Sequence, residues 1–243
     1  MEKQADIIEI FSSIQGEGPY IGCRQIFVRF AGCNLSCNYC DTDFQPQDFC
    51  RVHKDSDVKK IRNPVSLEQL IKEIKEFKRL PFHSISLTGG EPLMYVDFLV
   101  ELLPKLKDTV IYLETNGTLV KELEKIIEHI GIISTDVKLK SSTGAEFPAE
   151  KHKRFIETAL SHNKEIFAKA VITSKTSDEE IKEVSDLLNS FGKDILLVLQ
   201  PVDSKSGEIS VSTEKLLQVQ EKFLAGLRDV RVIPQVHKFL GLL

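Results

Sequence analysis

Three cysteines crowd into one short segment, at Cys33, Cys37 and Cys40. Their separations by three and two residues let a single loop wrap three thiolates around one face of a cubane iron–sulfur cluster. Four thiolates normally saturate such a cluster. With three, one iron keeps an open position that can chelate the amino and carboxylate groups of S-adenosylmethionine (SAM) and pass an electron to its sulfonium. The triplet therefore predicts a catalyst built on a 4Fe-4S cluster and SAM.

A structural zinc site is the alternative that the same residues leave open. Cys37 and Cys40 are followed by Cys50 and His53, and the two pairs have plausible spacing for tetrahedral zinc ligands. The corresponding function is a zinc-stabilised binding module. Cys23 stands apart from both patterns and is interpreted as a packed or surface thiol.

A second motif, TGGEP at residues 88–92, ends a predicted strand downstream of the cysteines. Paired glycines let backbone groups come close to a bound cofactor. Together with the cysteine triplet on the preceding β/α unit, this motif resembles the SAM-binding motif of the radical SAM superfamily. In that superfamily, backbone atoms at this place receive the methionine amino group, and the intervals within the cysteine triplet match as well.

The elements that must position these motifs follow a regular pattern. Short β-rich runs alternate with amphipathic stretches, as expected when parallel strands are each followed by a covering helix. The predicted strands are residues 7–11, 25–31, 84–87, 110–113, 132–134, 165–172, 195–199 and 230–233. The predicted helices are residues 66–77, 96–106, 120–129, 149–162, 177–191 and 213–224. Six β/α units thus follow the opening strand.

The expected fold class is α/β, a partial six-stranded TIM-like (β/α) barrel of the radical SAM type. Sites in such barrels lie at the C-terminal ends of the strands, where we expect the motifs to meet. Residues 41–64 are polar and aperiodic, which predicts a long functional loop inserted after the cluster motif. Residues 1–243 are expected to form a single domain around this core.

Further segments resemble 7-carboxy-7-deazaguanine synthase over nearly the whole chain. They are residues 14–18 (IQGEG), 27–32 (FVRFAG) with the cysteines and the following Asp-Thr, 113–117 (LETNG), 136–138 (DVK), 200–203 (QPVD) and 232–241 (VIPQVHKFLG). Members of that family convert 6-carboxy-5,6,7,8-tetrahydropterin to 7-carboxy-7-deazaguanine with loss of ammonia, on the way to nucleosides such as queuosine. The resemblance implies the same carbon–nitrogen lyase activity here, started when a 5'-deoxyadenosyl radical abstracts hydrogen from C6 of the pterin.

The resemblance also implies a set of substrate contacts. They are Ile14, Gln15, Gly16, Glu17, Arg29, Thr88, His237 and Leu243. A buried amide and carboxylate can pair with the donor and acceptor edge of a pterin, and a guanidinium fork suits the substrate carboxylate. Arg29 is expected to face inward from its strand. His237 is expected on the terminal strand, and Leu243 stands where family members end in a proline. The alternative for residues 14–17 is a glycine-rich turn, the alternative for Arg29 is a surface ion pair, and the alternative for His237 is a structural role.

Contacts to the cofactors follow from the same likeness. The implied SAM contacts are Gly90, Glu91, Asp136, Val137, Lys138, Gln200, Pro201, Val202 and Asp203. The family has Ser-Pro-Lys at 136–138, so only Lys138 is retained, and Asp203 is placed where a carboxylate accepts from ribose hydroxyls. Thr42 matches a hydroxyl ligand of a Mg²⁺ ion beside the substrate, which suits the preference of magnesium for oxygen ligands.

Composition limits the classes of partner. The net charge is -4 with both signs interspersed, so no basic surface for nucleic acid stands out. No run reaches the roughly 18 apolar residues of a membrane helix, and an odd count of cysteines suits metal ligation in a reducing compartment, the cytoplasm. A homodimer and a flavodoxin- or ferredoxin-like electron donor are family expectations. A glycyl-radical-activating enzyme shares the cysteine spacing, but the IQGEG segment and the region of His237 favour the synthase.

Overall fold

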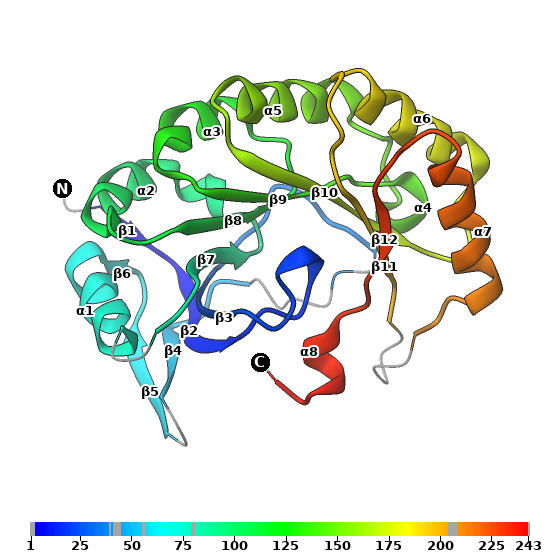
Figure 1. Ribbon diagram of the computed structural model, residues 1–243. Coiled ribbons are helices and arrows are strands. Elements are labelled where there is room, and N and C mark those ends of the chain that lie inside the picture. The colour runs from blue at the N-terminus through cyan, green and yellow to red at the C-terminus, as the bar shows by residue number, and fades with distance from the viewer. Residues whose placement is uncertain are drawn as a thin grey trace.

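The computed structural model describes residues 3–38, 40, 45–54, 57–78, 81–203 and 209–242. Within these residues a curved sheet has ten strands in the order β12-β11-β10-β9-β8-β7-β3-β2-β4-β5. The helices that follow the parallel strands lie along the outer, convex side of this sheet and do not cover its inner side (Figure 1). The arrangement is the incomplete barrel that the alternation of strands and helices predicts.

Seven consecutive strands of the sheet run parallel to one another. They are β3 (Arg24–Phe30), β7 (Ser84–Gly89), β8 (Ile111–Thr115), β9 (Ile132–Asp136), β10 (Glu165–Ile172), β11 (Leu197–Pro201) and β12 (Val230–Val232). The covering helices are α1 (Leu67–Phe77), α2 (Val96–Leu102), α3 (Val120–Ile126), α5 (Ala149–Ser161), α6 (Asp178–Asn189) and α7 (Thr213–Leu224). The six predicted β/α units, followed by a last strand, are therefore confirmed.

Short helical turns complete these units. They are η2 (Pro92–Tyr95), η3 (Leu103–Leu106), η4 (Ile127–His129) and α4 (Lys140–Thr143). Caps fix where the longer helices begin: the Ser66 hydroxyl accepts from the Gln69 amide at the start of α1, and Ser177 and Glu180 form a capping box at the start of α6. Among the described residues, no helix is long and apolar enough to cross a membrane.

Alternation along the strands separates a dry side from a polar side. On β7, Ile85 and Leu87 belong to the apolar core beneath the helices, whereas Ser86 and Thr88 take part in hydrogen bonds with Glu114. Successive side chains of a strand point to opposite faces, so the polar set lines the concave side. The main core therefore lies between sheet and helices, and the concave side is left for chemistry.

The predicted loop at residues 41–64 was wrong for most of its length. Strands β4 (Phe49–Lys54) and β5 (Asp57–Arg62) form a hairpin that extends the sheet through β2 (Ile7–Ile14). Cys50 and Val52 are buried on β4, whereas five of the six β5 residues are exposed. Because β5 is an edge strand with charged residues, its sequence lacks the apolar alternation of a central strand. The short strands β1 (Gln4–Ala5) and β6 (Val65–Ser66) pair separately.

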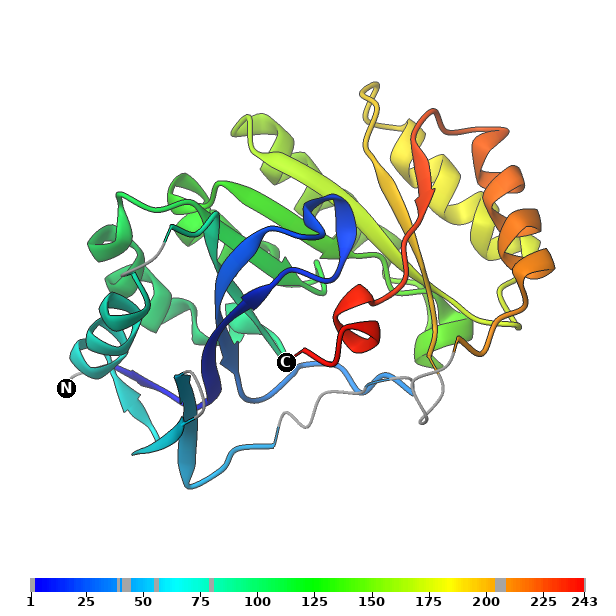
Figure 2. The same cartoon turned by 60° about the horizontal axis from the view of Figure 1, so that its bottom comes forward.

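Two segments fill the inside of the curved sheet. One is the turn after β2, which contains η1 (Gly18–Tyr20), and the other is α8 (Val236–Phe239) near the C-terminus (Figure 2). The turn packs on Tyr112 and Phe167, which form a small apolar cluster on this side. Since β2 runs antiparallel to β3, the turn begins at the edge of the sheet opposite the cysteine loop. The expectation that every motif lies at the strand C-terminal ends was thus wrong for residues 14–17.

Candidate active site

The cysteine loop leaves the C-terminal end of β3. Cys33, Cys37 and Cys40 form no disulfide, and Cys40 is exposed. Burial raises the pKa of the Cys33 and Cys37 thiols, and neighbouring cysteines raise both pKa values further, because a second negative charge close by disfavours the thiolate. The loop is held from the side by Asn116 of the β8 end, whose Nδ2 donates to Asn34 Oδ1 at 2.7 Å and lies 3.9 Å from Cys33 Sγ. Thr42 lies outside the described residues.

The paired glycines bring the end of β7 against this loop. Gly90 donates its amide to the Phe30 carbonyl at 3.1 Å, and a Cβ added at Gly90 would lie only 1.8 Å from the Gly32 carbonyl oxygen. Gly89 has φ +117°, and its Cβ would lie 2.3 Å from the Phe30 oxygen. Both positions therefore require glycine. The close approach is made to the strand that delivers the cysteines, so the TGGEP motif fixes where the cluster loop begins.

Glu91 joins the same turn to the next strand. Its buried carboxylate accepts from the amides of Leu93 at 3.1 Å and Asn116 at 2.8 Å, and from the Thr115 hydroxyl. Burial raises the pKa of Glu91 to about 7 despite these bonds. Both oxygens are thus engaged within the fold, and Glu91 holds the ends of β7 and β8 together around Asn116.

The zinc alternative is wrong, because its four residues lie in different surroundings. Cys50 is fully buried in the core, where burial raises the pKa of its thiol to about 12. His53 Nε2 instead lies 3.2 Å from Glu9 Oε2. Throughout the described ranges, no three His, Cys, Asp or Glu side chains converge as ligands of a single metal ion.

The segment at the end of β9 contributes a cation near the thiols. Lys138 Nζ contacts Asp136 Oδ2 at 2.7 Å, and its positive charge counteracts the rise in the Cys33 and Cys37 pKa values. Val137 is buried in the core, so only its backbone is available to a ligand. The Lys138 amide donates to Nε2 of buried His152 at 3.3 Å, which fixes this segment from α5.

The segment at the end of β11 presents two oxygens that have no partner. Gln200 Oε1 and Asp203 Oδ1 are buried and without a hydrogen-bond partner, although Asp203 Oδ2 lies 3.1 Å from Lys238 Nζ. Pro201 is buried, and Val202 packs against the core. Buried acceptors without partners are rare in native proteins unless a ligand satisfies them. The three thiols suit a 4Fe-4S cluster, and these two oxygens, together with the backbone of Gly90 beside the cysteine loop, suit a SAM molecule bound to it.

A hydrogen-bond network connects the turn after β2 to β7. Gln15 Nε2 donates to Gln25 Oε1 at 3.0 Å and to Glu114 Oε1 at 2.9 Å, and Glu114 Oε2 accepts from Thr88 at 2.6 Å. Gln15 Oε1 accepts from the Glu17 amide, which shapes the turn. The structure therefore brings Gln15 and Thr88 together through Glu114, to which sequence analysis assigned no role.

Glu17 lies farther along the same turn in a second network. Its carboxylate contacts Lys169 of β10 and accepts from Gln235 Nε2 at 2.7 Å. Although burial alone raises the pKa of Glu17, Lys169 lowers it below the ordinary value. Lys169 also lies 3.2 Å from Asp136, so the proposed substrate and cofactor segments share one buried cation.

Arg29 faces the concave side, as predicted. It stands in register with Thr88 on β7, and its Nε donates to Glu9 Oε1 at 2.9 Å. The other Glu9 oxygen lies within 3.3 Å of Arg51 and 3.2 Å of His53. Two guanidinium groups on one carboxylate leave a net positive corner, and the guanidinium carbon of Arg29 lies 5.7 Å from the Phe11 ring centroid. Such a corner suits an anionic group of a ligand.

The C-terminal segment closes onto the turn. His237 lies in α8 rather than on a strand, because the chain leaves β12 and bends inward. The Val236 amide donates to the Gly16 carbonyl at 2.9 Å, and a Cβ added at Gly16 would lie 2.3 Å from His237 Nδ1. Ile14 ends β2 beside this contact in a half-buried position. Leu243 lies outside the described residues.

Comparisons with known proteins agree with this geometry. The sequence pattern of the Radical SAM superfamily matches residues 27–188. The chain is 40% identical to the 7-carboxy-7-deazaguanine synthase of Geobacter sulfurreducens, over 98% of this chain and 97% of that protein. It is 36% identical to the enzyme of the same name from Archaeoglobus fulgidus, over 98% and 99%.

Solved structures share the fold at lower identity. The crystal structure of QueE from Escherichia coli superposes with a TM-score of 0.61 at 21% identity, over 96% of this chain and 95% of that one. The structure of anSMEcpe with bound AdoMet gives a TM-score of 0.54 at 20% identity, over 83% and 58%. With near full-length identity of 40% to a named relative, the chain belongs to the 7-carboxy-7-deazaguanine synthase family of the radical SAM superfamily.

Proposed function

We propose that this chain converts 6-carboxy-5,6,7,8-tetrahydropterin to 7-carboxy-7-deazaguanine, with loss of ammonia, in deazaguanine nucleoside biosynthesis. The observation that carries the proposal is the polar network of Gln15, Glu114 and Thr88 on the concave face of the sheet that also delivers the cysteine loop. The names of the relatives support the same activity.

In this proposal the substrate lies between the turn after β2 and the cysteine loop. Gln15 and Glu17 supply amide and carboxylate groups for the donor and acceptor edge of the pterin, and Ile14 and Gly16 contribute backbone. Arg29 binds the carboxylate with the guanidinium nitrogens that Glu9 does not occupy. The remaining proposed substrate contacts are Thr88, His237 and Leu243.

The cofactor side is proposed from the loops at the strand C-terminal ends. Cys33, Cys37 and Cys40 hold the 4Fe-4S cluster, which with SAM supplies the radical that abstracts hydrogen from the substrate. Lys138 offers a cation to the SAM carboxylate, and Gly90 offers backbone. The other proposed contacts are the orphan oxygens of Gln200 and Asp203, the positioning carboxylates of Glu91 and Asp136, and backbone of Val137, Pro201 and Val202.

Further parts of the proposal concern the surroundings of the site. A Mg²⁺ ion held by the Thr42 hydroxyl and substrate oxygens neutralises charge beside the pterin. The chain works as a homodimer of single-domain subunits and takes electrons from a flavodoxin- or ferredoxin-like protein. Thiols that must stay reduced for cluster assembly suit the cytoplasm.

Anaerobic turnover tests the proposal directly. The reconstituted protein is incubated with SAM, reductant, Mg²⁺ and 6-carboxytetrahydropterin, and the products are identified by mass spectrometry. We expect 7-carboxy-7-deazaguanine together with 5'-deoxyadenosine and methionine, and less product when Mg²⁺ is withheld. Cleavage of SAM with no conversion of the pterin would reject the substrate and point instead to a protein substrate, as in glycyl-radical activation.

A further inference from the structure

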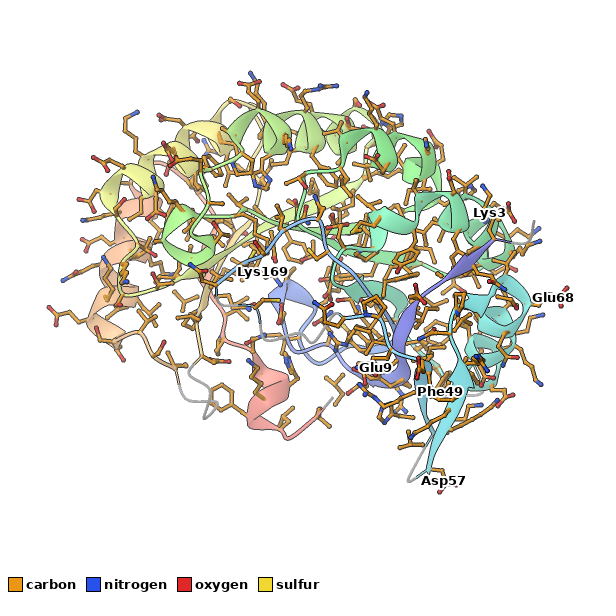
Figure 3. All side chains as sticks on the ribbon, turned by 180° about the vertical axis from the view of Figure 1, so that it is seen from behind. Lys3, Glu9, Phe49, Asp57, Glu68 and Lys169 are labelled. Atoms are coloured by element: carbon orange, nitrogen blue, oxygen red, sulfur yellow. The ribbon has the colours of Figure 1, made fainter. Side chains whose placement is uncertain are left out.

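The Lys169 side chain is paired with two half-buried carboxylates, Glu17 in the turn after β2 and Asp136 at the end of β9. It rises from the concave face of β10, where Figure 3 labels it inside the curve of the sheet. Its side chain is 9% exposed, contacts Glu17 Oε2 and lies 3.2 Å from Asp136 Oδ1. A lysine is rarely buried unless it is paired, so both contacts sustain its charge.

The pairing extends in both directions from Lys169. Toward the turn after β2, Gln235 donates to the other oxygen of Glu17 at 2.7 Å. Toward the cysteine loop, Asp136 Oδ2 accepts from Lys138. The positive charge of Lys138 interacts favourably with the thiolate forms of Cys33 and Cys37. Charges thus alternate along Glu17, Lys169, Asp136 and Lys138, from the proposed pterin site to the proposed SAM site. In surroundings of low dielectric, each member of such a chain affects its neighbours strongly.

We propose that Lys169 is a positioning residue that couples the two ligands: pterin bound at Glu17 raises the affinity for SAM, and SAM raises the affinity for pterin by the same factor. The inference rests on the proposed function, because it assigns Glu17 to the pterin and Lys138 to SAM. It adds an energetic link between the two sites that neither assignment contains.

The direction of the coupling follows from the contacts. A pterin N–H that donates to Glu17 uses the carboxylate that now holds Lys169, so the ammonium moves toward Asp136. Asp136 then attracts Lys138 less strongly, and the Lys138 ammonium becomes available to the SAM carboxylate. Glu17 thereby exchanges its ion pair for hydrogen bonds from the pterin and Gln235, while Lys169 and Lys138 each keep a carboxylate partner.

Equilibrium binding to the holoenzyme tests the link. The cluster is kept oxidised and no reductant is added, so neither ligand is consumed. The Kd of SAM is measured by anaerobic equilibrium dialysis with and without saturating 6-carboxytetrahydropterin. We expect the pterin to tighten SAM binding by about 5- to 10-fold in the unaltered protein, within the usual range of coupling between sites.

Two variants remove the link from opposite ends. Lys169→Met keeps the length of the side chain without the charge. Asp136→Asn leaves Lys169 paired with Glu17, and it can therefore be used for the same test if Lys169→Met does not purify. Both should bring the ratio of the two Kd values to about 1. The matched control is Lys182→Met, which breaks an exposed pair with Asp186 on α6 and should keep the full ratio.

The outcomes separate the two ideas. If the unaltered protein binds both ligands with independent affinities, or if both variants keep its ratio, the role of Lys169 is overturned while the proposed function stands. If the unaltered protein binds SAM but no pterin, the proposed function itself fails. A merely structural lysine would change both Kd values of a variant equally and leave their ratio as it was.

Discussion

Gly90 is the glycine at which an added Cβ would clash most severely with neighbouring atoms. A Cβ at this residue would lie 1.8 Å from the Gly32 carbonyl oxygen and 3.2 Å from the Cys33 amide nitrogen, whereas real Cβ contacts below 3.0 Å essentially never occur. In Gly90→Ala, the end of β7 and the cysteine loop must therefore separate by roughly 1 Å. Overpacking of this kind costs about 2 kcal/mol.

Two measurements follow from that displacement. A loss of about 2 kcal/mol lowers the Tm of a chain of this length by about 4 to 8 °C. A reacting group displaced by about 1 Å lowers turnover by about 100-fold, so production of 7-carboxy-7-deazaguanine should fall far more than the iron content. The assays are a thermal melt, iron analysis and anaerobic turnover of the same reconstituted sample.

Gly226→Ala is the matched control, because the nearest atom to its added Cβ lies at 3.6 Å, an ordinary contact. It should keep the Tm and turnover of the unaltered protein. A Gly90→Ala protein with the turnover of the unaltered enzyme would refute the claim that this glycine fixes the distance between β7 and the cysteine loop.

Three further predictions concern the cluster, the substrate and pH. Cys37→Ala should purify without the brown iron–sulfur colour and form no 5'-deoxyadenosine, whereas Cys23→Ala should keep both; SAM cleavage by the first variant would exclude Cys37 as a ligand. Arg29→Ala should keep the iron but bind 6-carboxytetrahydropterin about 10- to 100-fold more weakly, the worth of lost charge-assisted bonds, and an unchanged Kd would remove Arg29 from the site. Burial and the charge of Lys138 lower the pKa of His152 to about 4, from 6.5 in the unfolded chain, so the unfolded state gains the extra proton as the pH falls below 6.5. Between pH 7 and pH 5, the free energy of unfolding of the unaltered protein should fall by about 2 kcal/mol more than that of His152→Gln. Urea unfolding measures both values, and equal decreases would contradict a neutral buried imidazole.

Local features of the fold were predictable because they are written in neighbouring residues. The period of apolar residues located the strands and helices of six β/α units, and α7 at residues 213–224 matches its prediction at both ends. The hairpin of β4 and β5 escaped prediction because β5 buries only one of its six residues, Ile61. A strand without alternation differs little from a polar loop in its sequence.

The sequence alone predicted which residues ligate a cluster and approach a cofactor, since the spacing of three thiols and the requirement for glycine act over a few residues. Tertiary structure alone decided which polar groups meet. Gln15 reaches Glu114 across 99 residues, and Lys169 reaches Glu17 across 152. A charged residue within an otherwise apolar strand signals that Lys169 has a buried partner, but not which one. Partners so distant in sequence are chosen by the curvature of the sheet and the inward path of the turn after β2, which depend on the packing of the whole barrel.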